Sequence, residues 1–369
     1  MTRRSRPVRL AVVVGLALAG LTALPSSSVA DGQREGRYPG LPYVECIDYS
    51  GNNCSLGPDT ANDYGWLNTA QNGLAGSPAA KQWISIPTTV LAVNATFDIQ
   101  IVDPQPGFTF DQLSPAYSRA FFVSPTVSDD TYGDTVPIVV RTVAFGSIPV
   151  EVTLQVSQRR TAEDLPIPIQ LNTLDERKDL EGGGFTEIVH PTSIEDTLNV
   201  RIRKVVVDGV DTQLDGTCET GPTAAISAAS GRFERTTPPD WTPPEGSEGA
   251  ASVLQLEYDP AEAMSALLGG TLRGTLDIPS FRHCTTKTGD DLSPLLTSAV
   301  SGPDNPVVLQ VGALSCAEYD DQGRSRPPAP GTTSADLQCF DFYPFNPKIK
   351  AKPDPAPIPD HAPGEQPPE

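Results

Sequence analysis

Apolar and polar residues alternate along several stretches of this chain, and no other feature limits its folding so strongly. Apolar side chains occupy every second position from Val150 to Val156 and from Leu198 to Ile202. A two-residue period turns one face of a strand towards a core and the other towards water, as in an antiparallel sheet. The 38 prolines and 31 glycines suit many short strands joined by turns. We therefore expect an all-β chain built from antiparallel β-sandwich units.

Several strands can be placed from this pattern. Phe97, Ile99 and Ile101 alternate with polar residues, so we expect them to face inward. The nearly unbroken apolar run 136–145 predicts a more deeply buried strand. Further strands are expected at 224–233, 253–258, 272–278, 296–301 and 307–311.

Prolines, glycines and one short helical pattern predict what lies between these strands. Pro166 and Pro168 interrupt an alternating segment, and because proline cannot donate to a ladder, an edge strand is expected there. Asp208-Gly209 predicts a two-residue hairpin, since both residues tolerate a positive φ. Residues 261–268 form the best short helical pattern, and the proline-rich stretch 236–247 is expected to be an exposed loop.

The length favours more than one globular unit. Removal of a signal would leave 339 residues, and single cores stop growing at about 250–300 residues. The charged, glycine-rich stretch 172–186 is the expected boundary. The expected organisation is a signal peptide at 1–30, an irregular disulfide-stapled segment at 31–80, β-sandwich units at 81–175 and 184–345, and a disordered proline-rich tail at 346–369.

The first 30 residues have the pattern of an export signal. A segment with four arginines precedes the apolar run 10–24 and small residues that end at Ala30. That run has 15 residues, whereas a spanning helix needs about 20, so we expect cleavage after Ala30 and no transmembrane segment afterwards. Arg3-Arg4 keeps twin-arginine export as an alternative to the ordinary secretory route. The expected location is the extracellular space or the cell envelope.

Export would place all six cysteines where thiols oxidise. Fifteen pairings are open, and we favour neighbours in the sequence. A metal site is the alternative, but there is no Cys-x-x-Cys pair and His283-Cys284 is isolated. The favoured disulfides are Cys46–Cys54, Cys218–Cys284 and Cys316–Cys339.

Acidic residues dominate the charge. The formal net charge is −20, and removal of the four arginines of the signal leaves −24. Such a field repels phosphate backbones, so we expect no nucleic-acid partner. Asp129, Asp130 and Asp134 are weak candidates for a calcium site. Because calcium needs six to eight oxygens, a polar turn is the preferred interpretation, and no cofactor is assigned.

No residue pattern for catalysis is found. The chain has no Gly-x-Ser-x-Gly, no glycine-rich phosphate loop and no His-Glu-x-x-His. With 46 acids, a pair of carboxylates found in the sequence carries no information. We therefore assign no catalytic or cofactor-binding residue. Trp241 is a candidate ligand contact, because a Pro-Pro pair lies close by on each side and an amphipathic ring on a stiff loop can stack on a sugar.

Three segments, 205–218, 270–284 and 290–305, resemble a group of secreted actinobacterial β-rich proteins of unknown function. The resemblance covers about residues 196–316. It implies a Cys218–Cys284 bridge and brings no catalytic or ligand-binding residue.

The leading hypothesis is a secreted, non-enzymatic protein of the bacterial envelope or extracellular space with a binding or structural role. One alternative is a glycan-binding or adhesin-like module that uses loop aromatics such as Trp241. A second is an extracellular hydrolase with an unrecognised acid pair, and a third is a calcium-stabilised module. The partner is expected to be an envelope or extracellular ligand that the sequence does not identify.

Overall fold

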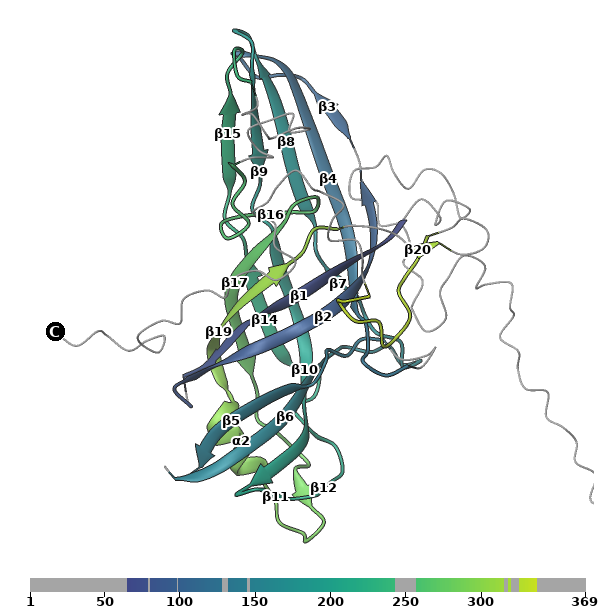
Figure 1. Ribbon diagram of the computed structural model, residues 1–369, viewed down its shortest axis with the longest axis vertical. Helices are drawn as coiled ribbons and strands as arrows, with labels where there is room; N and C mark the ends of the chain where they lie inside the picture. The colour runs from purple at the N-terminus through teal and green to yellow at the C-terminus, as the bar shows by residue number, and fades with distance from the viewer. Residues whose placement is uncertain are drawn as a thin grey trace, which may run out of the picture. The chain divides into compact units, whose positions relative to one another are not determined.

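Most of the regular structure is β, as the alternation predicts. The computed structural model describes residues 65–336 except 79, 98, 128–131, 145–146, 243–256, 315–317 and 320–324. All of these residues lie in the unit Gly36–Glu369. Within it, 17 strands join in one large antiparallel sheet that curls (Figure 1).

The longer strands form the body of this sheet. They are β1 (Gly65–Ser77), β2 (Gln82–Phe97), β4 (Phe108–Phe122), β5 (Ile138–Ala144), β6 (Ile148–Gln158), β8 (Thr173–Leu180), β9 (Phe185–Val189), β10 (Ser193–Val207), β14 (Ala224–Ala229), β15 (Phe233–Thr237), β17 (Gly269–Ile278) and β19 (Gly302–Val311).

Short strands and one helix complete the described elements. They are β3 (Gln100–Val102), β7 (Ile169–Gln170), β11 (Val210–Asp211), β12 (Leu214–Asp215), β13 (Cys218–Glu219), β16 (Met264–Ser265), β18 (Thr285–Thr286), β20 (Glu318–Tyr319), β21 (Ser325–Arg326) and α2 (Ser293–Val300).

The longer strands pair in the order β5–β6–β10–β14–β17–β19–β1–β2–β4–β8–β9–β15. The sheet curls so that its β5 end approaches β2. At one end this seam is closed by a hydrogen bond between β2 and the segment before β5, and by two more between β6 and β4. The Val136 amide donates to Thr89 Oγ1 at 3.3 Å. Gln158 Nε2 donates to the Ala120 carbonyl at 3.0 Å, and its Oε1 accepts from the Phe122 amide at 2.9 Å.

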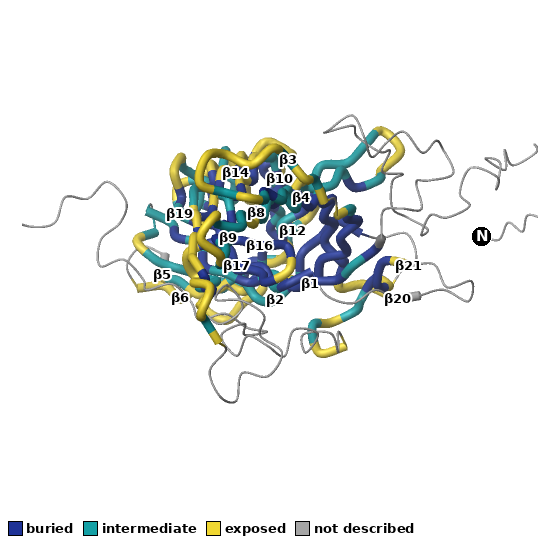
Figure 2. The backbone as a smooth tube through the Cα atoms, turned by 90° about the horizontal axis from the view of Figure 1, so that it is seen from above, coloured by how far each residue is buried: buried dark blue, intermediate teal, exposed yellow. Residues whose placement is uncertain are grey.

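The inward faces form the core. Val152 and Leu154 on β6, Val200 on β10 and Leu309 on β19 are each at most 6% exposed. Figure 2 shows buried backbone in the interior and exposed segments around it. The alternation in β6 and β10 therefore predicted the inward face correctly.

Two apolar segments are more exposed than their sequences predict. On β5, Ile138 is 2% exposed, but Val139 is 50% and Val143 is 59% exposed. This strand pairs only with β6 among the described strands, so it is an edge and not a deeply buried strand. Phe97, Ile99 and Ile101 are 46%, 67% and 60% exposed, so the expectation that they face inward was wrong. They lie where β2 ends and the short strand β3 pairs with β4 alone.

One expected strand is a helix, and one expected helix is absent. The segment expected as strand 296–301 lies mainly in α2, where Pro294 in the first turn has the fixed φ that helices accept there. Residues 261–268 instead form a turn and β16, which pairs with β17 at Gly269 and Gly270. A Cβ on Gly270 would overlap the Ala263 carbonyl oxygen, so this close pairing needs glycine.

The expected boundary at 172–186 is a β-hairpin. Strands β8 and β9 pair across it, and Gly183 and Gly184 adopt positive φ values of 85° and 78° in the turn. Strands from both expected sandwich units also share one sheet, because β6 pairs with β10. The segment 31–80, expected to be irregular, supplies β1 in its described part.

The predicted Asp208-Gly209 turn is confirmed. Val207 pairs with Val210, and the two turn residues have φ values of 48° and 78°. Pro166 and Pro168 precede β7, a short strand whose one partner among the described strands is β4. The expected signal peptide and the expected tail lie outside the described residues.

Candidate ligand-binding cavity

The curled sheet encloses a cavity of about 860 Å³. Elements from many parts of the chain form its walls, among them β1, β2, β4, β5, β6, β10, β14, β17, β19 and α2. Ligand pockets for drug-sized molecules usually measure about 300–1,000 Å³. The cavity therefore has the volume of a binding site rather than of a packing defect.

The wall is made by the alternating residues of the strands. Val150, Val152, Leu154 and Val156 of β6 all line the cavity. On β10 both Val200 and Val205 line it, although five positions separate them. The pairing of β10 with β6 shifts between Ile202 and Lys204, and such a bulge turns the following side chains back to the same face.

Helix α2 covers part of the cavity with one apolar face. Leu292, Leu296 and Val300 follow one another at intervals of four residues and all line the cavity. Residues four apart lie on the same face of a helix, so these three side chains form one stripe. The helix is therefore a wall of the cavity.

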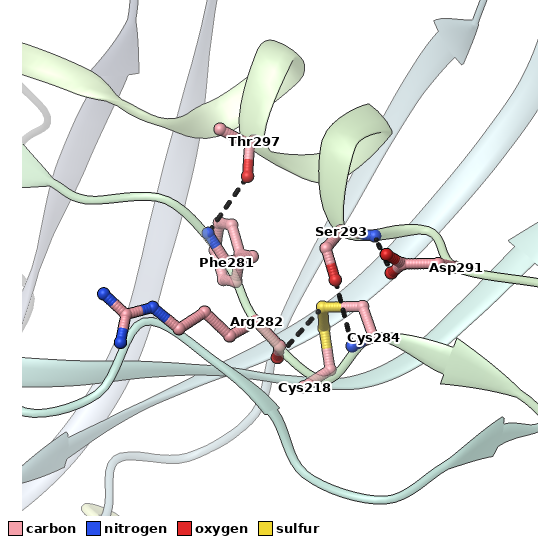
Figure 3. The surroundings of a disulfide bond; sticks show 7 residues. All are labelled: Cys218, Phe281, Arg282, Cys284, Asp291, Ser293 and Thr297. Atoms are coloured by element: carbon pink, nitrogen blue, oxygen red, sulfur yellow. Dashed lines mark hydrogen bonds between the residues drawn. A yellow bond between two sulfur atoms is a disulfide. The ribbon is translucent and has the colours of Figure 1, made fainter.

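The disulfide Cys218–Cys284 anchors this helix, and its pairing confirms the prediction. Figure 3 shows the bridge beneath the first turn of α2, where the Cys284 amide donates to Ser293 Oγ at 3.2 Å. The Leu292 amide donates to the Cys284 carbonyl at 2.8 Å. The Phe281 amide donates to Thr297 Oγ1 at 3.0 Å, one turn further along α2 (Figure 3). The covalent link thus fixes a helix that lines the cavity.

The cavity opens where the β1–β2 turn, β5 and α2 meet. The lining residues that are exposed come from these three elements: Lys81 from the turn, Arg141 and Val143 from β5, and Ser298 from α2. Ser77 Oγ donates to the Ala299 carbonyl at 3.2 Å and so joins the hairpin to the helix beside the opening. The seam between β5 and β2 is unpaired here, whereas Val136 closes it at the other end.

Most polar groups on the wall already have partners within the protein. Asn305 Nδ2 donates to the carbonyls of Leu276 and Gly302 at 3.0 and 2.7 Å. Thr135 Oγ1 accepts from the Val156 amide at 3.1 Å. Gln71 differs, because its carboxamide makes no hydrogen bond to the described part of the chain and remains available to a ligand. The wall therefore favours hydrocarbon over most of its area.

The charged residues among those lining the cavity are Lys81 and Arg141, both at the opening, and no aspartate or glutamate lines it. This contrasts with the chain as a whole, which has 46 acidic and 26 basic residues. Arg141 Nε donates to Glu151 Oε2 at 2.9 Å, across the β5–β6 pairing.

The residues proposed from the sequence as metal or ligand contacts do not form this site. Asp134 is buried between β4 and β6, where it bridges Ser157, and its Oδ1 has no hydrogen-bond partner. Asp129 and Asp130 lie outside the described residues, within which no group of three or more His, Cys, Asp or Glu is placed to hold a metal ion. Trp241 is half-buried, its amide donates to the Pro238 carbonyl at 3.1 Å, and it does not line the cavity.

The other two expected disulfides, Cys46–Cys54 and Cys316–Cys339, involve cysteines outside the described residues. They remain predictions.

A second cluster of ionisable groups was not foreseen from the sequence. On β8, Glu176 accepts from Lys178 Nζ and contacts His190 Nε2, each at 2.7 Å. Burial raises the pKa of Glu176, but the hydrogen bonds from Lys178 and His190 outweigh it and hold the pKa below the usual value. Burial, followed by the negative charge of Glu176, raises the pKa of Asp111 on β4.

Asp175 lies next to Glu176 in the same strand but interacts with different residues. Ser265 Oγ donates to Asp175 Oδ2 at 2.7 Å, and burial raises the pKa of Asp175 to about 6. Tyr258 donates to the Gly269 carbonyl and accepts from the Ser265 amide, and burial raises its pKa as well. None of these residues lines the cavity, and they hold β8 against β16.

The search for relatives gave no match. No protein-family model, curated protein or solved structure matches this chain. In the described part of the chain, none of the helices has the length and apolar character to span a bilayer. The function is therefore argued from the cavity.

Proposed function

We propose that this protein binds a small molecule with a large apolar part inside the curled sheet. One observation carries the proposal: a cavity of about 860 Å³ has a wall rich in valine, leucine and isoleucine, and its exposed lining residues come from the β1–β2 turn, β5 and α2. Apolar pockets of this kind bury most of a ligand's surface, and burial contributes roughly 25 cal/mol per Å² of apolar area. The role is carriage or storage of a molecule that water dissolves poorly.

The cavity favours binding over catalysis. A hydrolase with paired carboxylates needs them beside the substrate, and neither Asp111 nor Glu176 lines the cavity. A glycan site needs polar groups along its wall, whereas the strands here present valine, isoleucine and leucine. The non-enzymatic binding role expected from the sequence is therefore the interpretation that we retain.

We place this role outside the cytoplasm, in the envelope or extracellular space. Two observations support the location. The first 30 residues have the pattern of a cleaved export signal, and the buried Cys218–Cys284 disulfide suits a compartment where thiols oxidise.

The proposal is tested with N-phenyl-1-naphthylamine, a neutral probe that fluoresces in apolar surroundings. We expect saturable binding at one site per chain. The variant Val140→Trp should weaken it, because Val140 lines the cavity on β5 and an indole ring there would occupy part of it. The matched control is Val139→Trp, since Val139 is the adjacent residue of the same strand and points to solvent with 50% exposure.

Circular dichroism and thermal unfolding of both variants would show that each retains its fold. If the protein does not bind the probe, the proposal is wrong. It is also wrong if Val140→Trp and Val139→Trp bind the probe equally.

A further inference from the structure

We propose that the natural ligand is an amphipathic anion whose hydrocarbon part lies in the cavity and whose carboxylate or phosphate head lies at the opening, against Lys81 and Arg141. This inference rests on the proposed binding function and adds the chemical class of the ligand and its orientation. It is carried by the distribution of charge around the cavity.

The hydrocarbon end must point inward. The wall away from the opening is formed by apolar side chains, and its polar residues Asn305 and Thr135 are bonded within the protein. A charged head placed there would lose its hydration and meet little besides the neutral carboxamide of Gln71, which costs several kcal/mol. The polar end of an amphipathic ligand therefore lies where water still reaches, at the opening.

The charges at the opening select the sign of the head. Lys81 and Arg141 are the ionisable side chains that line the cavity, and neither an aspartate nor a glutamate joins them. Both cations lie at the rim, where Arg141 pairs with Glu151 and 80% of its side chain is exposed, so a head group held there stays in contact with water.

Arg141 retains donors for such a head. Its Nε donates to Glu151 Oε2, while its two Nη groups make no hydrogen bond to the described residues. A guanidinium has five N–H donors in a planar fork, which fits the oxygens of a carboxylate or a phosphate. Glu151 competes with the ligand head for the same guanidinium, and this competition gives the proposal a distinctive test.

The experiment compares laurate, dodecyl phosphate and dodecanol as competitors of the neutral probe N-phenyl-1-naphthylamine. The three compounds share one chain and differ in the head group. We expect both anions to bind more tightly than the alcohol, and added salt to reduce the difference. The comparison of laurate with dodecyl phosphate shows whether a carboxylate or a phosphate head binds more tightly at the opening.

Variants locate the head group. Lys81→Gln and Arg141→Gln should each weaken laurate by about two- to five-fold, the range for exposed charge pairs, and leave dodecanol unchanged. Arg177→Gln is the matched control, because Arg177 is an exposed arginine paired with Asp179 on β8 and does not line the cavity. Glu151→Gln should strengthen laurate binding, since the guanidinium loses its internal partner.

The outcomes separate the two proposals. If the probe and all three compounds fail to bind, the proposed function itself is wrong. If the alcohol binds as tightly as the anions, or if Glu151→Gln and Arg141→Gln leave laurate binding unchanged, the cavity remains a binding site but its ligand is not an anion.

Discussion

Asp175 illustrates how one buried carboxylate couples the fold to pH. Its Oδ1 is buried without a hydrogen-bond partner, and its pKa is raised to about 6 from an ordinary 3.8. Between these values the folded protein binds a proton that the unfolded chain releases. The stabilisation from this proton is therefore fully present below about pH 4, is lost as the pH rises from about 4 to 6, and is absent above that range, a change of about 3 kcal/mol for this group.

The variant Asp175→Asn should remove this contribution, because an amide does not titrate. We expect the difference in unfolding free energy between wild type and variant to change by about 3 kcal/mol between pH 4 and pH 7, measured by urea denaturation. Asp179→Asn is the control, because Asp179 lies on the same strand with 38% of its side chain exposed and pairs with Arg177. If the difference in unfolding free energy between wild type and Asp175→Asn stays the same from pH 4 to pH 7, a group other than Asp175 binds the proton.

Gln158 at the end of β6 is the residue that holds the closed end of the seam. It is 3% exposed and hydrogen-bonds the Phe122 amide and the carbonyls of Ala120 and Ile167. Gln158→Leu leaves these buried groups unpaired, which should cost about 2–4 kcal/mol of unfolding free energy. The control is Gln105→Leu in an exposed turn, which should change the unfolding free energy by no more than about 0.5 kcal/mol. Equal effects of the two variants would contradict the role of Gln158 in closing the seam.

Among the elements, α2 and its disulfide give a prediction that links stability to binding. Replacement of Cys218 and Cys284 by serine should lower the unfolding free energy by about 2–5 kcal/mol. Since the bridge anchors the first turn of α2, which lines the cavity, probe affinity should fall as well. Reductant should have a much smaller effect on probe binding by this double variant than by wild type. If the variant binds the probe like wild type, α2 does not depend on the bridge.

At the same scale, the sequence predicts some elements and misses others for identifiable reasons. The alternation of β6 and β10 and the Asp208-Gly209 turn are encoded locally, so both were predicted correctly. In β5 the run 136–145 is apolar on both faces, and the sequence does not reveal that one face meets a cavity and the other meets solvent. Strand β1 was missed because Asn68, Asn72 and Gly73 interrupt its apolar pattern. This strand is stabilised by pairing with β2 and β19.

At the scale of the whole molecule, the cavity itself was beyond the reach of the sequence. Alternation shows which side chains point inward, but not whether facing walls meet or leave a space. That depends on the curl of the sheet and on a helix at 293–300, where a strand was expected in part of the segment. The cations at the opening come from two distant elements, so no spacing in the sequence brings Lys81 and Arg141 together.

Ligand binding should also be visible as global stabilisation. A ligand at about 100 times its Kd raises the unfolding free energy by about 2.7 kcal/mol when it binds only the folded state. We expect laurate to raise the Tm of the wild type and of Val139→Trp, and to raise that of Val140→Trp by less. A similar shift in all three proteins would show that laurate acts outside the cavity.

The pairing of β1 with β19 has a consequence for how this protein is made. Gln71 near the start of the described chain is paired with Val311 near its end, so the sheet is completed only when β19 arrives. Strands that are far apart in the sequence pair slowly. The chain loses entropy when the long loop between them closes, and the stabilising contacts form only afterwards. A nascent or truncated chain that stops before β19 exposes a broad apolar wall to its surroundings. Strand order therefore predicts that such a chain needs a chaperone to stay in solution.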